Sequence, residues 1–440
     1  MNKLGRAALV VLVCGALSWS VSSFTSGARR SPPGSHVVVA EIAPIVVSPE
    51  LAELDARIAA HRARAEQRED NWLEWEFTAL GLMDRARLTG DYRDFQQADE
   101  AIARAFAHAS TGAGPHLTRA MLNFTVHRID RVESDLARTE RYLMLSSADR
   151  AAVRSLRADV AFYSGEYELA RRLYQEQLAF GRDAAALVAL AQLDWKTGRL
   201  EEADALLDEA WASAGSSVSM QAWLCLVRAT RSNDQRRFED ALVQVRRGLA
   251  LSPDDAHLSQ MAADLLSRSG RSDAALEIDR DLAARTSSPQ AMDGAAEILR
   301  DDGDLLAFAE LRDAARSAYE AQIALFPEAA YGHAVDHWLR LEDDTDMLIE
   351  IAEGNAAARP FGDSQVRLAM AYLRAHRDED ARDVVDRLLL TEWNTGEMHA
   401  VAALAYERTG DERRAESERS LAELSAPGIV DATSWLSEAR

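Results

Sequence analysis

The 440-residue chain has little of what common enzymes and disulfide-rich proteins carry. It contains two cysteines, Cys14 and Cys225, which excludes a multi-disulfide framework and a Cys-x-x-Cys site. It has no glycine-rich phosphate loop and no Gly-x-Ser-x-Gly nucleophile motif. Proline and glycine are scarce, with 10 and 22 residues, and alanine and leucine dominate the hydrophobic 48%. This composition favours helix over strand.

Acidic residues outnumber basic ones, and lysine is nearly absent. The formal net charge is −22, and the only lysines are Lys3 and Lys196. The first thirty residues carry four basic residues and no acid, so the rest of the chain has a net charge of −26. Such a chain should repel nucleic acids and anionic membrane surfaces, and we expect no nucleic-acid partner. The acidity also serves to keep an extended protein soluble. An arginine-rich, lysine-poor composition is typical of GC-rich bacterial genomes.

The N-terminus has the three-part pattern of a secretory signal. Lys3 and Arg6 precede an apolar run at 7–17, and small residues follow. The run is shorter than the ~20 residues that span a bilayer. Residues 1–28 are predicted to be a signal peptide or, if uncleaved, an N-terminal anchor and the only membrane contact. A lipoprotein would use Cys14, but Val13 before it is not small. We expect export to the periplasm or cell envelope, with secreted and membrane-anchored forms open, and an extended linker at 29–47.

A periodic turn signal runs along most of the chain. Apolar residues recur at helical spacing on both sides of each turn, as Leu187, Leu190 and Ala191 do before position 198 and Ala203 and Leu207 do after it. The turn positions lie 33 to 38 residues apart, except for one gap of 73 that is interpreted as two units with an insertion of roughly seven residues. Each unit is predicted to be two antiparallel helices. The turn positions are 165, 198, 236, 270, 303, 376 and 410.

This pattern resembles the tetratricopeptide repeat family. The resemblance lies in segments such as Gly165-Glu-Tyr-Glu-Leu-Ala170 and in closing prolines at Pro253 and Pro327. It covers about residues 70–425 and implies an all-α fold, a right-handed α-solenoid of about nine or ten antiparallel helix pairs with a concave groove. Residues 48–68 are predicted to form an opening helix. Residues 429–440 are predicted to form a closing helix.

The resemblance implies a non-catalytic protein- or peptide-binding scaffold, with no cofactor, and the leader indicates the bacterial cell envelope. A row of basic residues stands two places before the turns, at the helix end that borders the groove in this family. These residues would clamp a peptide carboxylate, and polar residues of the first helices would join them. Basic residues here also stabilise a helix C-terminus, so both interpretations stay open. The candidate partner-binding residues are Lys196, Arg268, Arg374, Arg408, Gln192, His257, Gln260 and Asp264.

Two other functions stay open. His333 and His337 lie four residues apart with Asp336 between them, which places two zinc ligands on one helix face. The motif is similar to the inverted zinc-protease motif, with Asp where that family has Glu. A metal-dependent hydrolase would need a third ligand from another helix, and the pair otherwise belongs to a solvated or groove-lining polar face. A structural homo-oligomeric assembly factor would use the apolar residues within 37–47. The main hypothesis includes no catalytic residue and no metal, and it leaves the oligomeric state open.

Overall fold

The computed structural model describes residues 49–68, 71–142 and 144–438. The predicted signal peptide, the predicted linker and the apolar residues within 37–47 lie outside this part. All regular elements in the described part are helices, so the predicted all-α solenoid is confirmed. None of these helices combines the length and the apolar character needed to cross a bilayer.

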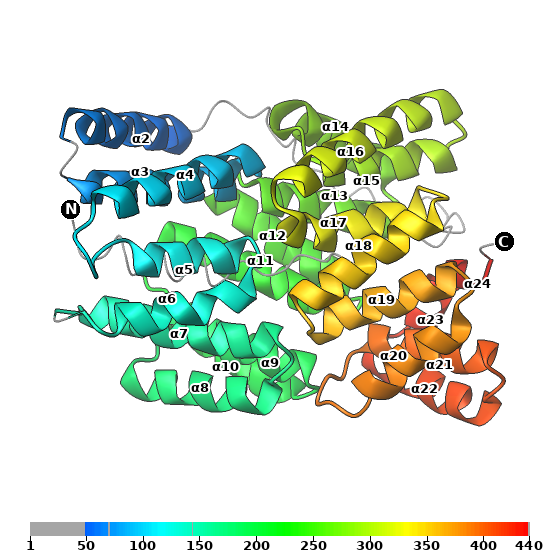
Figure 1. The fold of residues 1–440 in the computed structure, drawn as a ribbon. Helices are drawn as coiled ribbons and strands as arrows, with labels where there is room; N and C mark the ends of the chain where they lie inside the picture. Colours follow the sequence, from blue (N-terminus) through cyan, green and yellow to red (C-terminus); the bar gives the residue numbers. More distant parts are fainter. Residues whose placement is uncertain (1–48, 69–70, 143, 439–440) are drawn as a thin grey trace.

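Ten consecutive helix pairs make up the described array, which agrees with the predicted nine or ten (Figure 1). The first helices of the pairs are α3 (Trp72–Thr89), α5 (His116–Thr125), α7 (Ser147–Tyr163), α9 (Ala184–Lys196), α11 (Val218–Asp234), α13 (Ala256–Arg268), α15 (Pro289–Asp301), α17 (Pro327–Arg340), α19 (Gly362–Arg374) and α21 (Gly396–Arg408). The second helices are α4 (Tyr92–His108), α6 (Val132–Thr139), α8 (Tyr167–Phe180), α10 (Leu200–Ser213), α12 (Phe238–Leu251), α14 (Ser272–Thr286), α16 (Leu305–Leu325), α18 (Thr345–Ala358), α20 (Asp378–Leu388) and α22 (Glu412–Ser425).

The turn within each pair follows from one left-handed residue. All seven positions that the sequence singles out have φ between 55° and 84°, including the non-glycine residues Arg236 and His376. The next residue then donates its backbone N–H to the carbonyl five residues earlier, as Arg199 does to Asp194 at 2.8 Å. This bond ends the first helix and reverses the chain. Alanines five positions after the turn, such as Ala203 and Ala275, are fully buried, which lets the two helices approach closely.

Helix α16 carries the insertion. It has 21 residues, whereas the second helices α10 and α12 have 14 each. The N-terminal end of the array is covered by α2 (Pro49–Gln67), which packs on α3. At the other end, the segment expected to form one closing helix contains two short ones, α23 (Ile429–Thr433) and α24 (Trp435–Glu438).

The array closes on itself along a line of contacts that we call the closing seam. In the seam, turns of the first five pairs meet the start of α17 and the segments that precede α19, α21 and α23. Tyr92 donates to the carbonyl of Ala329 at 3.3 Å, and the Asn394 N–H donates to the carbonyl of Lys196 at 2.8 Å. Arg236 donates to the carbonyl of Pro427 at 3.1 Å. Figure 1 shows the blue-to-green half of the array beside the yellow-to-red half.

Aromatic side chains form the core of the closing seam. Tyr163 packs edge-on against Phe361 at 5.0 Å between ring centroids, and Trp393 lies 5.5 Å from Tyr167. The Trp393 ring covers Gly362 so closely that a Cβ there would lie 1.9 Å from it. Because these rings are buried in one continuous hydrophobic core, the inner face is not the open groove that the resemblance implies. What is left of it is a pocket that opens to solvent at one edge.

Candidate functional site

A recess with polar and apolar lining lies at the end of the seam where α3 and α4 meet α17, and we call it the central pocket. Its volume is about 290 Å³. One side comes from α3, α4 and the end of α5, and the other comes from α13 to α17. The two sides are joined by Phe95, whose ring packs edge-on against that of Phe326 at 6.4 Å. Gly90 and His257 line the pocket and are exposed, so it opens to solvent at this edge.

The pocket has apolar walls and an ionisable floor. Apolar contacts come from both sides, from residues such as Met83, Tyr92 and Leu282. The floor is built by the first helices of three consecutive pairs, α13, α15 and α17. Because residues three or four positions apart share one helix face, each of these helices presents a short polar row. The rows consist of Gln260 and Asp264, of Asp293 and Glu297, and of His333, Asp336, His337 and Arg340.

Carboxylates crowd this floor and raise one another's pKa values. Burial raises the pKa of Asp264 to about 6, and the neighbouring Asp336 adds to the rise. Burial also raises the pKa of Glu297 and that of Asp336, with Asp293 contributing to both. Asp279, which is 2% exposed and lies behind the floor, has a pKa well above its usual range because of burial and the nearby Asp264. Such shifts mark an environment that disfavours negative charge.

Two arginines balance part of this charge. Arg340 lies 2.7 Å from Glu297, and Arg367 lies 3.2 Å from Asp336. Asp264 and Asp279 have a neutral partner instead of an arginine. The amide of Gln260 donates to both of them, at 3.5 and 3.2 Å. No Lys, Arg or His nitrogen of the described chain is recorded within 4 Å of these two carboxylates.

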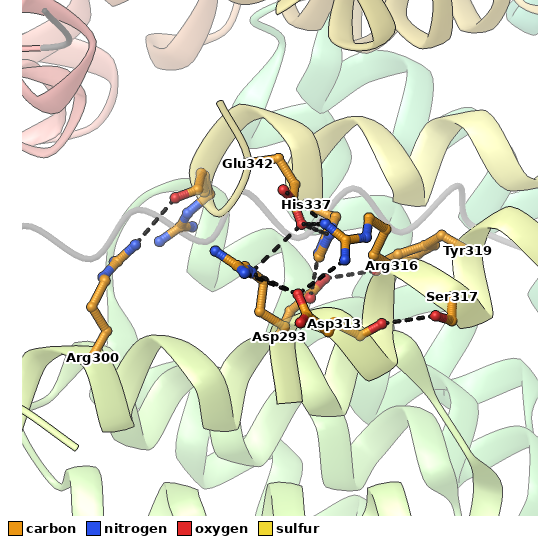
Figure 2. Close-up of polar contacts among 10 residues, drawn as sticks. Asp293, Arg300, Asp313, Arg316, Ser317, Tyr319, His337 and Glu342 are labelled. Carbon is orange, nitrogen blue, oxygen red and sulfur yellow. Dashed lines mark hydrogen bonds and ion pairs between the residues drawn. The ribbon is translucent and has the colours of Figure 1, made fainter. Parts of the chain in front are cut away.

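His337 is the centre of a buried hydrogen-bonded network next to the floor. Its side chain is fully buried, its Nδ1 lies 2.7 Å from Asp293, and its Nε2 lies 3.3 Å from Glu342. The hydroxyl of Tyr319 donates to the same Asp293 at 2.9 Å. Figure 2 shows His337 between the two carboxylates, with Arg316 donating to Glu342 at 3.3 Å. Both ring nitrogens therefore face carboxylates of the protein itself.

The metal hypothesis loses support from this arrangement. In the part of the chain that the structure describes, no group of three His, Cys, Asp or Glu side chains is arranged to hold a metal ion. His333 and His337 both line the central pocket, as a groove-lining face would, but His337 is buried rather than solvated. The third ligand that a hydrolase would need does not join them among the described residues.

The candidate partner-binding residues separate into two groups. His257, Gln260 and Asp264 line the central pocket, and Arg268 lies one helical turn beyond Asp264, with a pKa that burial lowers to about 10. Gln192 lies on α9, half-buried and away from this pocket.

The other three basic residues serve contacts within the chain. Lys196 lies in the seam between Asp234 and Asp363, at 3.1 and 3.3 Å; burial opposes its charge, but these two carboxylates outweigh it and raise the pKa. Arg408 donates to the carbonyls of Leu373 and Leu436 and so holds the closing helices. Arg374 lies 3.5 Å from the exposed Asp343. These contacts within the chain account for the three basic residues without a bound partner. Their role in binding a partner stays a prediction.

Asp293, Glu297 and Arg340 were not predicted as site residues from the sequence. A signal for the two carboxylates exists in the repeat itself. Asp293 follows Gln260 by 33 residues, which is one repeat, and Glu297 follows Asp264 by the same distance. Asp293 and Glu297 therefore occupy in α15 the positions that Gln260 and Asp264 occupy in α13.

Comparison with known proteins places the chain among no named family. No protein-family model matches it, and no curated protein matches it. Solved structures that it resembles include the human IFIT1 dimer with m7Gppp-AAAA, at 13% identity over 87% of this chain and 96% of that one, with a TM-score of 0.39. A Rap protein complexed with competence and sporulation factor matches at 13% identity over 82% and 98%, with a TM-score of 0.43. The APC/C hetero-tetramer Cut9-Hcn1 matches at 13% identity over 89% and 96%, with a TM-score of 0.33. Likeness at this level assigns no function to the chain.

Proposed function

We propose that the protein is a non-catalytic scaffold of the bacterial cell envelope that binds a peptide segment of a partner protein in the central pocket. The observation that carries this proposal is the pocket itself, because the N-terminal helices α3 and α4 and the helices α13 to α17 line it together. Apolar walls with a few convergent polar groups are what a recognition site needs for affinity and orientation. Its volume suits one or two side chains of a peptide.

The chemistry of the floor supports binding more than catalysis. A general base or a metal ligand needs a nitrogen or oxygen free to face the substrate. In His337, Nδ1 is hydrogen-bonded to Asp293, and the buried Nε2 makes no hydrogen bond within the described chain but lies 3.3 Å from Glu342. The location in the cell envelope rests on the leader pattern at 1–28 and is part of the proposal.

Selection from a random peptide library displayed on phage tests the proposal. The protein without its predicted leader, residues 31–440, would be immobilised, and enriched peptides would be measured by fluorescence anisotropy. We expect peptides with dissociation constants in the micromolar range that lose at least tenfold in affinity when Ala256→Trp fills the mouth of the pocket. Leu424→Trp, at a side chain that is 82% exposed on α22, is the matched control and should bind normally.

Two results would contradict the proposal. The first is the enrichment of no peptide, and the second is binding that A256W leaves unchanged. A single-stranded RNA oligonucleotide serves as a further probe, because the net charge of −26 on residues 31–440 predicts that it will not bind. RNA binding that A256W abolishes would replace the peptide with a nucleic acid as the ligand of this pocket.

A further inference from the structure

We propose that the floor of the central pocket accepts a positively charged group, the guanidinium or ammonium of an Arg or Lys side chain in the bound peptide. This inference rests on the proposed function and adds the chemical class of the ligand. The group would lie against Asp264 of α13, across from the polar rows of α15 and α17.

The arrangement of Asp264 and Asp279 is the first reason. Both carboxylates accept from the same Gln260 amide, and no cation of the described chain is recorded within 4 Å of either. Asp279 is 2% exposed, so water compensates little of its charge. A buried carboxylate that has only a neutral hydrogen-bond donor is costly to maintain. Its neighbour Asp264 lines the pocket, where a ligand reaches it.

The charge balance of the lining is the second reason. The lining contains four carboxylates, of Asp264, Asp293, Glu297 and Asp336, and two arginines, Arg87 and Arg340. Arg340 is paired with Glu297 at 2.7 Å. Asp336 is paired with Arg367 at 3.2 Å, and Asp293 lies 2.7 Å from Nδ1 of His337. In the described chain, Asp264 is the one lining carboxylate with no Arg, Lys or His nitrogen within 4 Å.

Arg268 is the only cation of α13 near Asp264, one helical turn away. It lowers the pKa of Asp264, yet burial still raises that pKa to about 6. The guanidinium of Arg268 lies over the ring of Phe238, 5.8 Å from its centroid, and lines a separate small recess with Lys196. Arg268 therefore leaves the pocket-facing side of Asp264 to an external cation. A cation at this place would favour the ionised form of Asp264 and weaken the repulsion between Asp264 and Asp336.

The test compares a charged side chain with a neutral one of the same shape. Peptides enriched by the phage selection would be synthesised with acetylated N-termini and amidated C-termini, so that side chains supply the only charge. Each Arg would be replaced by citrulline and each Lys by norleucine, one at a time. We expect one position at which this change weakens binding at least tenfold in fluorescence anisotropy at pH 7.5.

Substitution of Asp264 locates the effect. Asp264→Asn should remove most of the preference for Arg over citrulline. The control is Asp273→Asn, at an exposed residue of α14 outside the pocket, and it should keep the full preference. Thermal unfolding of each variant shows whether it is folded, and the citrulline peptide shows whether its pocket is intact.

The outcomes separate this inference from the function on which it depends. If no peptide binds, the proposed function fails. If peptides bind but neither citrulline nor D264N changes the affinity, the scaffold stands and the cation site is wrong. Agmatine that competes with the peptide at equal concentration would support the cation site and would make a small amine, rather than a peptide, its source.

Discussion

Asp264→Asn should stabilise the protein at neutral pH, in the absence of any ligand. Burial raises the pKa of Asp264 from 3.8 to about 6 in the folded state. An acid with a higher pKa in the folded state binds its proton more tightly there, so its ionisation destabilises the fold. The penalty is absent below pH 4, grows between pH 4 and 6, and is complete above pH 6.

The size of the effect follows from the same shift. A rise of about two units corresponds to roughly 3 kcal/mol, and partial contact of this side chain with solvent lowers the figure to about 2 kcal/mol. For a cooperative unit of this length, that difference raises the melting temperature by about 2–3 °C. Asparagine keeps the size of the side chain and an acceptor for Gln260, so it removes little besides the charge.

Circular dichroism melts of residues 31–440 at pH 4, 6 and 8 provide the measurement. The difference in melting temperature between D264N and the parent chain should be near zero at pH 4 and largest at pH 8. Asp273→Asn, at an exposed position, should show no such trend. A difference that is constant with pH, or a D264N protein that is less stable at pH 8, would refute the reasoning about an uncompensated carboxylate.

Three further predictions concern the turns, the seam and the buried histidine. Gly270→Ala should lower the free energy of urea unfolding by about 1 kcal/mol, because Gly270 has a φ of 74° and open space around it. Gly198→Ala should lower it by more, because its Cβ would lie 2.8 Å from the Asn394 amide. Equal losses in the two variants would contradict a packed seam. Trp393→Ala should cost about 3–5 kcal/mol by emptying the seam core, and a loss below about 1 kcal/mol would argue that the two halves are not packed together. His337→Leu should cost about 3–5 kcal/mol because it leaves two carboxylates without their imidazole, and a neutral result in the same assay would exclude the network around it.

Most of the helix order could be predicted from the sequence because it depends on local chemistry. A residue with positive φ is needed at each turn, and glycine supplies it most easily. The two non-glycine turns were still found, since Ala241 and Ala381 stand at the right distance after Arg236 and His376. The turn between α17 and α18 gave no such signal. It has no left-handed residue, and Asp344 instead caps the next helix by accepting from the Met347 N–H at 3.0 Å.

The candidate site was predicted only in part, because it depends on contacts between distant segments. The polar faces of α13 and α17 were visible as Gln260, Asp264, His333 and His337. The face of α15 between them was not predicted. No local pattern shows that the N-terminal helices close over these faces, since that closure depends on pairs such as Tyr92 and Ala329, which lie far apart in the sequence.

The insertion in α16 explains why the pocket forms at this place in the seam. Elsewhere in the seam, the repeats of the two halves have nearly the same length. Successive turns of one half therefore stay opposite successive segments of the other. The seven extra residues lengthen α16 by about 10 Å and shift the start of α17 accordingly. This shift brings Phe326, which follows α16, against Phe95 of α4, at the edge of the array's first pair. Tyr319 and Gln322, both on α16, then line the space between this contact and α13. The break in the repeat therefore sets the pocket's position, and the polar faces of the repeats on either side set its chemistry.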